Sequence, residues 1–313
     1  MLLEPSRVLL TDRVAVVTGA AVGIGRAIAL AFARFGADVA MCDRDSENLA
    51  AAATDVEATG RTALIRQLDV RDGDAMGEFA RDVRERFGRV DVLVNNAGGG
   101  FRSEFLSVSV KGQDALVREN FDSVTHCVRA FVPLMPAAGA SIINLTSVEA
   151  HRAAPGFAVY AAQKAAVMSL SKTLALELGA TRIRVNCIAP DVIPTPGVGP
   201  LEGPAGHVPL ETVGHVDDVA AAAVYLAGDM ARFVTGITLN VDGGTAAAGG
   251  WHRLPDGGWR REVGLAYRLT GAPEGARRPG DGHHLPAEDS VRCHRGLIHG
   301  SPPAMRAALM IPW

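Results

Sequence analysis

The hydrophobic pattern of the chain alternates between two kinds of segment. Short apolar runs rich in β-branched residues recur along the first three quarters of the sequence, and longer segments with a 3.6-residue period separate them. Continuous apolar runs of this kind are typical of parallel strands covered on both faces by helices. The pattern therefore predicts a doubly wound α/β fold with a parallel seven-stranded sheet, whose strands cover residues 13–18, 38–43, 63–68, 91–96, 141–146, 183–188 and 237–241.

This pattern stops near residue 249. The last 65 residues contain 11 Gly, 7 Pro and nine Arg and have no sustained period, a composition typical of chains that bury too little to become ordered. We therefore predict one Rossmann-like domain over residues 1–248 and a partly disordered extension over residues 249–313. As an alternative, the first part of the extension, with Trp251 and Trp259, docks on the domain.

The bulk composition excludes several classes of function. A net charge of -3 and a pI near 6.3 argue against nucleic acid or an anionic membrane as a partner. The four cysteines show no metal-ligand spacing, and the tail histidines of "DGHHLP" lack a second ligand pair, so no metal site is expected. The opening residues lack the basic start and apolar run of a signal peptide, and no apolar stretch is long enough to span a membrane. We expect a cytoplasmic protein.

A glycine-rich turn follows the first predicted strand. The sequence "TGAAVGIG", Thr18 to Gly25, leads directly into a helical pattern. Glycines at such a turn let the backbone approach a pyrophosphate, whose charge is met by the free amides of the helix N-terminus. Glycines also serve tight turns that bind nothing. With a strand before it and a helix after it, the turn predicts a dinucleotide site that includes Gly19, Val22, Gly23 and Ile24.

The residues at the tip of the second strand bear on the choice of cofactor. Asp43 stands eighteen residues beyond Gly25, where an acid is expected to accept hydrogen bonds from the adenosine ribose. Its carboxylate repels a 2′-phosphate, which favours NAD over NADP. Arg44 argues in the other direction because it is able to pair with a phosphate, but Val22 supplies no second cation.

The sequence "YAAQK" lies within a long helical pattern and places Lys164 one turn after Tyr160. Positions i and i+4 share a helix face, so the ammonium and the phenol can meet. The same spacing also arises by chance, with the lysine simply solvated.

Eight motifs occur in a characteristic order along residues 10–248. They are "TGAAVGIG", "LDV" at 68–70, "NNAG" at 95–98, Asn120 in "REN", Ser147 in "NLTS", "YAAQK", "IAP" at 188–190 and "DGG" at 242–244. In these motifs the chain resembles the short-chain dehydrogenase/reductase family, in its members of roughly 250 residues. The resemblance implies a strand order of 3-2-1-4-5-6-7, hydride transfer with a nicotinamide cofactor, and a homodimer or homotetramer formed through helices near the Tyr and Lys.

The chemistry of the Tyr and Lys pair agrees with this resemblance. A phenol has an ordinary pKa of about 10 and is a poor base near neutrality. A neighbouring ammonium and a positive nicotinamide favour the phenolate, so Lys164 is expected to lower the pKa of Tyr160. Ser147 is expected to hydrogen-bond the substrate oxygen, although a serine at a strand end also forms loops.

The resemblance assigns further roles. It implies that Lys164 holds the nicotinamide ribose and that Asn120 holds a water joining Lys164 to solvent; Asn120 alternatively caps a bend in its helix. Asn96 is expected to tie strands together beside the cofactor. The remaining residues expected at the cofactor are Asp43, Arg44, Asp69, Val70, Ala97, Gly98, Tyr160, Pro190, Ile193 and Thr195.

Asp191 departs from the family pattern, which has Gly after the proline. A carboxylate pointing inward is predicted to favour the oxidised nicotinamide and alcohol oxidation. A solvent-facing loop carboxylate is the alternative, and we favour it.

Substrate specificity is expected from residues 148–157 and from a Pro- and Gly-rich loop over residues 191–214 that reads as a compact lid. An apolar wall is predicted from Phe157, Val159, Val192, Val198 and Leu201, while Glu149 and His151 are either polar groups of the site or simply solvated. We therefore expect a hydrophobic secondary alcohol or ketone as substrate. The alternatives are an NADPH-dependent ketone or 3-oxoacyl reductase, and a regulator that binds NAD without turnover.

Overall fold

The computed structural model describes residues 4–196, 208–253 and 258–261. The chain divides into two units, Met1–Val263 and Gly264–Trp313, and all described residues belong to the first. Val198, Leu201, Cys293 and the tail histidines lie outside the described residues.

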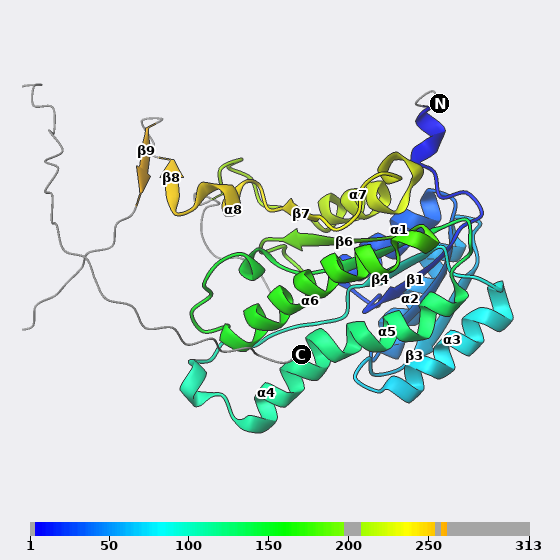
Figure 1. Ribbon diagram of the computed structural model, residues 1–313, viewed down its shortest axis with the longest axis horizontal. Helices are drawn as coiled ribbons and strands as arrows, with labels where there is room; N and C mark the ends of the chain where they lie inside the picture. The colour runs from blue at the N-terminus through cyan, green and yellow to red at the C-terminus, as the bar shows by residue number, and fades with distance from the viewer. Residues whose placement is uncertain (1–3, 197–207, 254–257, 262–313) are drawn as a thin grey trace, which may run out of the picture. The chain divides into compact units, whose positions relative to one another are not determined.

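A parallel seven-stranded sheet forms the centre of the first unit (Figure 1), in the predicted order β3-β2-β1-β4-β5-β6-β7. The predicted fold class and all seven predicted strands are confirmed, with ends that differ by at most two residues. The strands are β1 Val14–Thr18, β2 Asp38–Asp43, β3 Ala63–Gln67, β4 Val92–Asn95, β5 Ala140–Leu145, β6 Ile183–Pro190 and β7 Thr238–Val241.

Helices cover both faces of the sheet, as the continuous apolar strands require. One apolar core joins the sheet to α1 Gly23–Arg34, α2 Ser46–Glu57 and α7 Val216–Ala227. The other core joins it to α3 Gly73–Phe87, α5 Ser123–Phe131 and α6 Ala158–Glu177. In each strand successive side chains therefore enter opposite cores: Ala15 and Val17 belong to the first core and Val16 to the second.

Short elements fill the connections between these helices and strands. They are α4 Val110–Val117, the π-helical turn η3 Arg118–Asp122, α8 Thr245–Ala248 and the 3₁₀ turns η1 Pro5–Val8, η2 Phe105–Ser107, η4 Val132–Leu134, η5 Val148–Ala150, η6 Gly179–Thr181 and η7 Asp229–Ala231. None of the described helices is both long enough and apolar enough to cross a bilayer.

The described part of the predicted extension forms a β-hairpin. Strand β8 Trp251–Arg253 pairs antiparallel with β9 Trp259–Arg261. Gly249 and Gly250 precede it with φ of 56° and 89°, angles in the left-handed region that glycine adopts without a steric penalty. The domain boundary at residue 248 stays a prediction.

The three described cysteines, Cys42, Cys127 and Cys187, are free and buried. Burial raises the pKa of Cys42 and raises that of Cys127 to about 12, so both stay protonated near neutrality. They behave as small apolar side chains, as expected from their apolar segments.

Close packing between the start of α1 and the glycine turn depends on Gly25. A Cβ at this position would stand 2.0 Å from the carbonyl oxygen of Gly19. We expect Gly25→Ala to reduce the free energy of unfolding by about 1–3 kcal/mol, because the backbone must move apart. Gly77→Ala, inside α3, is the matched control, since a Cβ there meets nothing within 4 Å; it should stabilise the protein by about 0.5–1 kcal/mol. Urea titrations measure both values, and equal stabilities would contradict this packing.

Candidate active site

The predicted site residues come from loops and strand ends at the carboxyl edge of the sheet. These are the loops after β1, β2, β3, β4, β5 and β6, together with η3 and α6. In such folds this edge carries the ligand site because all parallel strands end there.

Lys164 is buried in α6 with only 5% of its surface exposed. Its Nζ donates a hydrogen bond to the carbonyl oxygen of Leu145, the last residue of β5, at 3.0 Å. Burial lowers the pKa of Lys164 to about 8. The idea that this lysine is merely solvated is therefore wrong.

The phenol of Tyr160 lies beside Lys164, whose Nζ is 5.6 Å from the centre of the Tyr160 ring. Burial raises the pKa of Tyr160, a hydrogen bond with the Ser147 hydroxyl lowers it, and the Glu149 carboxylate raises it further. The net shift is upward, whereas we expected Lys164 to lower this pKa. The physical reason is that loss of water around the phenol outweighs the other influences in the protein without a bound cofactor.

Ser147 follows β5 and caps the turn η5 through its hydroxyl, which accepts a hydrogen bond from the amide of Glu149 at 3.2 Å. It is 9% exposed. The same hydroxyl lowers the pKa of Tyr160. The loop-forming role and the position beside the phenol are therefore both present in one residue.

Asn120 is fully buried in η3. Its Nδ2 donates to the carbonyl oxygens of Gly99 at 2.8 Å and Leu116 at 3.0 Å. Leu116 is four residues upstream, so the side chain takes an acceptor that the helix ladder would otherwise use, and the chain passes through a π-helical turn. The predicted capping of a helix bend is confirmed. The water-holding role stays a prediction.

Glycines after β4 allow these polar groups to come together. A Cβ on Gly98 would stand 2.8 Å from Asn120 Oδ1 and 3.0 Å from Lys164 Nζ, and one on Gly100 would stand 3.1 Å from Tyr160 Cδ2. Gly98 was expected beside the cofactor, whereas Gly100 was not anticipated. The run of three glycines at 98–100 is the signal that would have indicated this close approach.

The contact between α6 and the sheet includes buried, hydrogen-bonded polar side chains. Asn144 in β5 donates to Ser171 Oγ in α6 at 2.8 Å and accepts from Asn95 Nδ2 in β4 at 2.7 Å. These bonds link three elements beneath the catalytic candidates, and buried bonds of this kind specify one arrangement of the packed elements.

The N-terminus of α1 lacks a side-chain cap. Val22 at the N-cap position makes no capping hydrogen bond, and the first turn carries no acidic residue. Gly19 and Gly23 have φ of 65° and 60°, and a Cβ on Gly19 would stand 2.9 Å from Ala97 Cα. This glycine-lined turn fits the pyrophosphate of a dinucleotide because the helix N-terminus has neither a side-chain cap nor an acidic residue in its first turn.

Asp43 ends β2 next to this turn, as expected. Its Oδ2 accepts from the amide of Ala21 at 3.1 Å and its Oδ1 from the amide of Asp45 at 3.1 Å. Arg44 turns instead to Glu119, with which it forms an ion pair at 3.4 Å. The Asp43 carboxylate is therefore held at the turn by backbone amides, while Arg44 is 60% exposed.

Asn96 ties β4 to the glycine turn, as the sequence predicted. Its amide donates to Thr18 Oγ1 at 3.1 Å, and its Nδ2 donates to the carbonyl oxygens of Thr18 and Gly19, each at 3.0 Å. The turn is thereby locked onto the neighbouring strand.

Asp69 forms an ion pair with Arg71, which the sequence analysis did not predict. Arg71 Nε lies 2.9 Å from both carboxylate oxygens of Asp69, and this hydrogen bonding is the main cause of the lowered pKa of Asp69. Val70, which lies between these two residues in the sequence, is buried. The two-residue spacing of Asp69 and Arg71 in "DVR" was the sequence signal for this ion pair. The predicted contact of Asp69 with adenine stays a prediction.

Three expected cofactor residues follow or end β6. Pro190 is the last residue of the strand. Ile193 is 4% exposed and its side chain belongs to the core with α1 and α7, so only its backbone is able to face a cofactor. Thr195 Cγ2 would lie 3.1 Å from a Cβ on Gly23, so Thr195 lies against the glycine turn, and its predicted contact with the nicotinamide stays a prediction.

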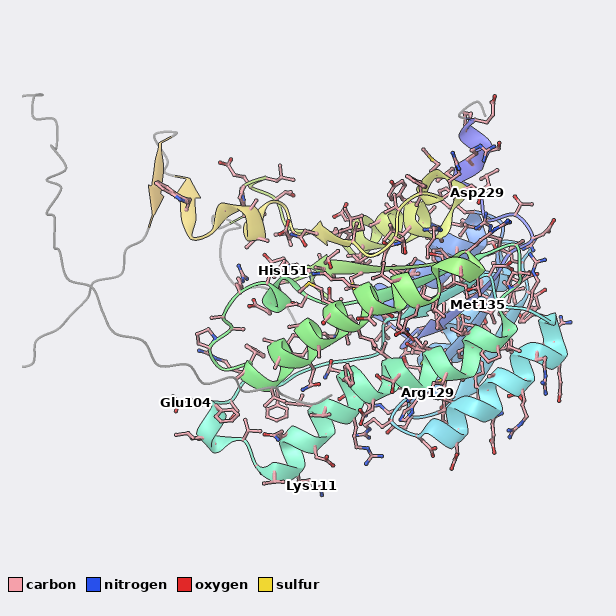
Figure 2. All side chains as sticks on the ribbon, in the orientation of Figure 1. Glu104, Lys111, Arg129, Met135, His151 and Asp229 are labelled. Carbon is pink, nitrogen blue, oxygen red and sulfur yellow. The ribbon has the colours of Figure 1, made fainter. Side chains whose placement is uncertain are left out.

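The described residues of the predicted apolar wall differ in their exposure to solvent. Phe157 packs edge-on against Tyr160, with ring centres 6.4 Å apart, and Val159 is buried. Val192 is 52% exposed. His151 is exposed on the loop after η5 (Figure 2), whereas Glu149 is half-buried and acts on Tyr160.

Asp191 faces the protein, so the favoured solvent-facing position is wrong. Its side chain is 17% exposed and lies 3.9 Å from Arg152 NH2. Arg152 also pairs with Glu149 at 2.8 Å, and the pKa of Arg152 is raised mainly by its hydrogen bond with Glu149. Sequence reasoning missed Arg152; its i+3 spacing from Glu149 was the available signal.

No group of three His, Cys, Asp or Glu side chains in the described ranges is arranged to hold a metal ion.

Comparison with known proteins agrees with this geometry. Residues 19–246 match the family described as enoyl-(acyl carrier protein) reductase. An uncharacterized oxidoreductase of Mycobacterium tuberculosis is 40% identical over 244 residues, covering 75% of this chain and 92% of the relative. The 3-oxoacyl-[acyl-carrier-protein] reductase FabG of Chlamydia trachomatis is 36% identical, covering 76% and 99%. A cyclohexanol dehydrogenase of a Rhodococcus species is 35% identical, covering 75% and 96%.

A solved structure with the same fold is that of carveol dehydrogenase from Mycobacterium avium in complex with NAD. It has a TM-score of 0.73 and 31% identity and covers 76% of this chain and 99% of its own. The chain belongs to the short-chain dehydrogenase/reductase family. It is an oxidoreductase of CH–OH and keto groups.

Burial of the Lys164 ammonium predicts a pH dependence of stability. The pKa is about 8 in the folded protein and 10.5 as the ordinary value, so between these pH values the folded state binds fewer protons than the unfolded state. Stability contributed at this position therefore increases as pH rises from about 8 to 10.5. Relative to Lys164→Met, the wild-type free energy of unfolding should increase by about 3 kcal/mol over this range.

Urea titrations of the two proteins without cofactor, at pH 7 to 10.5, measure this difference. Taking the difference between wild type and variant cancels the titration of the buried thiols. A constant difference across the range would show that burial does not lower the pKa of Lys164.

Proposed function

We propose that the chain interconverts a mainly apolar secondary alcohol and its ketone with NAD(H), using Tyr160 as general acid and base. The observation that carries this proposal is the position of Tyr160 beside the buried Lys164, with the Ser147 hydroxyl lowering the pKa of the phenol, at the same sheet edge as the glycine turn. When bound, the nicotinamide accepts hydride from the alcohol carbon or donates it to the ketone carbon. The relatives named as dehydrogenases and reductases support this chemistry.

Each residue has a distinct role in the proposal. Tyr160 transfers a proton to the ketone oxygen in reduction and removes it from the hydroxyl in oxidation. Ser147 positions the substrate oxygen by hydrogen bonding. Lys164 holds the nicotinamide ribose and places positive charge near the phenol, and Asn120 connects Lys164 to solvent through a water.

Reduction of a ketone or 3-oxoacyl group with NADPH is the second candidate, and the relative named as a 3-oxoacyl-[acyl-carrier-protein] reductase favours it. The alternative of a regulator without turnover has no support from the comparisons.

The cofactor proposal places the adenosine ribose at Asp43 and the pyrophosphate at Gly19, Val22, Gly23 and Ile24. Asp69, Val70, Asn96, Ala97 and Gly98 line the adenine and central parts, and Pro190, Ile193 and Thr195 the nicotinamide. NAD is favoured over NADP because the Asp43 carboxylate is held at the turn while Arg44 pairs with Glu119. The predicted bias of Asp191 toward the oxidised cofactor stays a prediction, and Arg152 offsets part of its charge.

The proposed assembly is a homodimer or homotetramer in the cytoplasm. Exposed apolar residues near α4 and on α6 support association, with Leu106 95%, Val110 86% and Leu176 83% exposed.

Replacing the phenol tests the catalytic assignment. Tyr160→Phe should reduce kcat by at least about 100-fold, because the proton transfer assigned to the phenol is lost. Tyr225→Phe, on the surface of α7 and 36% exposed, is the matched control and should retain wild-type kcat. A panel of secondary alcohols and ketones, followed by NADH absorbance, provides the assay. Equal turnover by both variants would remove Tyr160 from the mechanism.

The charge of Asp43 should set cofactor preference. In wild type, kcat/KM for NADH is expected to exceed that for NADPH. Asp43→Ser should lower this ratio by roughly tenfold or more, since the repulsion of a 2′-phosphate is lost. The same charge change at Asp55→Ser, in α2, serves as the control. Wild-type preference for NADPH would instead support the reductase alternative.

A further inference from the structure

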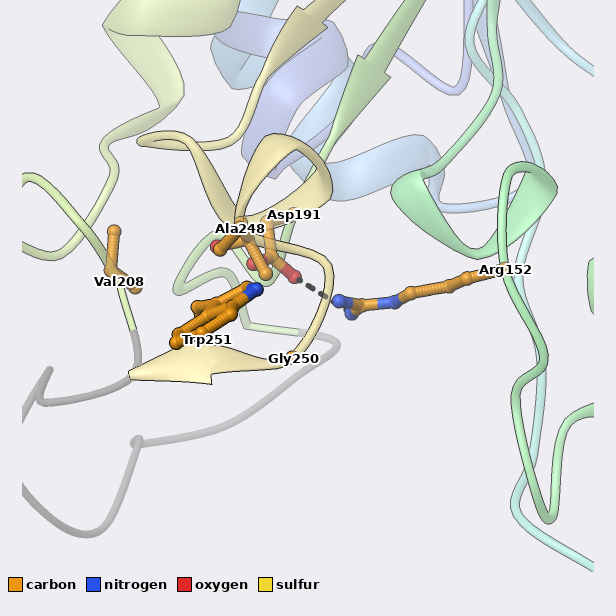
Figure 3. Close-up of a pocket in the computed structure, with 7 residues that line it drawn as sticks. Arg152, Asp191, Val208, Ala248, Gly250 and Trp251 are labelled. Carbon is orange, nitrogen blue, oxygen red and sulfur yellow. Dashed lines mark ion pairs between the residues drawn. The ribbon is translucent and has the colours of Figure 1, made fainter. Parts of the chain in front are cut away.

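A pocket of about 240 Å³ lies at the ends of β6 and β7. Its lining includes two charged side chains, Arg152 and Asp191, and the indole of Trp251 (Figure 3). They come from the loop after β5, the end of β6 and the hairpin strand β8, segments far apart in the sequence. Val208, Thr245, Ala248 and Gly250 complete the lining.

The charges at this pocket are not balanced. Arg152 reaches Glu149 through two nitrogens, at 2.8 and 3.3 Å, but it lies 3.9 Å from Asp191. Within the described ranges the Asp191 carboxylate accepts no hydrogen bond. By contrast, Asp242 nearby is satisfied by the amides of Gly244 at 2.9 Å and Ala246 at 2.8 Å. Asp191 is thus a half-buried acceptor with unused capacity.

Trp251 supplies the apolar side of the pocket. The left-handed backbone at Gly249 and Gly250 turns the chain immediately before it. Figure 3 shows its indole directly below Asp191 and Ala248, across the pocket from the loop that carries Arg152. An indole beside a carboxylate suits a ligand that combines an apolar body with a polar group.

The pocket is connected to the reacting end of the site. Glu149, the partner of Arg152, follows Ser147 by two residues and acts electrostatically on Tyr160. Ser147 and Arg152 belong to the same loop after β5, so this loop contributes both to the reacting end of the site and to the pocket.

We propose that the pocket between Arg152, Asp191 and Trp251 binds the part of the substrate remote from the reacting carbon and selects a hydrogen-bond donor there. The donor is a hydroxyl or an ammonium carried on an apolar ring or chain. Asp191 accepts the hydrogen bond, Trp251 covers the apolar body, and a carboxylate at this point is repelled. The inference rests on the proposed function and narrows its substrate class from apolar to amphipathic compounds.

Four cyclohexanones test the proposal. They carry ethyl, hydroxymethyl, dimethylammonio or carboxylate on the carbon opposite the carbonyl. Binding to the full-length protein with NAD is measured by calorimetry, and reduction is measured separately with NADH and NADPH. The hydroxymethyl or the dimethylammonio compound should bind at least about tenfold tighter than the ethyl compound, and the carboxylate weakest. Which of the two gains identifies the donor as neutral or cationic.

Substitutions of Asp191 and Trp251 test whether these residues cause the binding preference. Asp191→Asn should remove most of the donor preference and of the discrimination against carboxylate. Asp82→Asn is the matched control, because it is also an arginine-paired aspartate but lies on α3; it should leave the preference unchanged. Trp251→Ala should weaken all four compounds by roughly fivefold, whereas Phe233→Ala, at a 95% exposed residue, should have no effect.

The outcomes separate the two proposals. Equal binding of the four compounds, tightest binding of the carboxylate, or a preference that survives Asp191→Asn would overturn the assignment of the pocket. Absence of reduction of every compound with both cofactors would count against the proposed function, while calorimetry still decides the pocket.

Discussion

The buried ammonium of Lys164 is the constraint on which the site depends. A charge removed from water is tolerated only where it is hydrogen-bonded, and the carbonyl oxygen of Leu145 supplies that bond at 3.0 Å. This bond fixes α6 against the end of β5, and α6 carries Tyr160. Gly98 leaves the space that the ammonium needs. The position of the phenol is therefore a consequence of how the lysine is accommodated.

The two ends of the site use different physical means. At the proposed nucleotide end, backbone groups predominate: an uncapped helix, glycines with positive φ, and amides that hold Asp43. At the substrate end, side-chain charges dominate, with Arg152 between Glu149 and Asp191. Backbone recognition suits a ligand with a constant phosphate geometry, whereas side-chain charges are easily varied to suit different substrates.

Electrostatic expectations from the sequence were the least reliable. The spacing of Tyr160 and Lys164 indicated correctly that the two side chains lie side by side, but the pKa of the phenol shifts upward because burial outweighs the effect of the Ser147 hydroxyl. Asp191 seemed a solvent-facing loop residue, yet it faces Arg152. In both cases the result depends on how much water and which distant charges surround the group, and neither quantity is encoded locally.

The sequence by itself determined the parallel α/β fold, the strand positions and the glycine turn, because continuous apolar runs, the 3.6-residue period and the glycine requirement are local properties. The spacing of Tyr160 and Lys164 is likewise a property of one helix. Only the tertiary structure decided that Ile193 enters the core and that Trp251 shares a pocket with Arg152 and Asp191. These contacts join segments brought together by the packing of the sheet and its loops, and no local pattern specifies which side chains meet there.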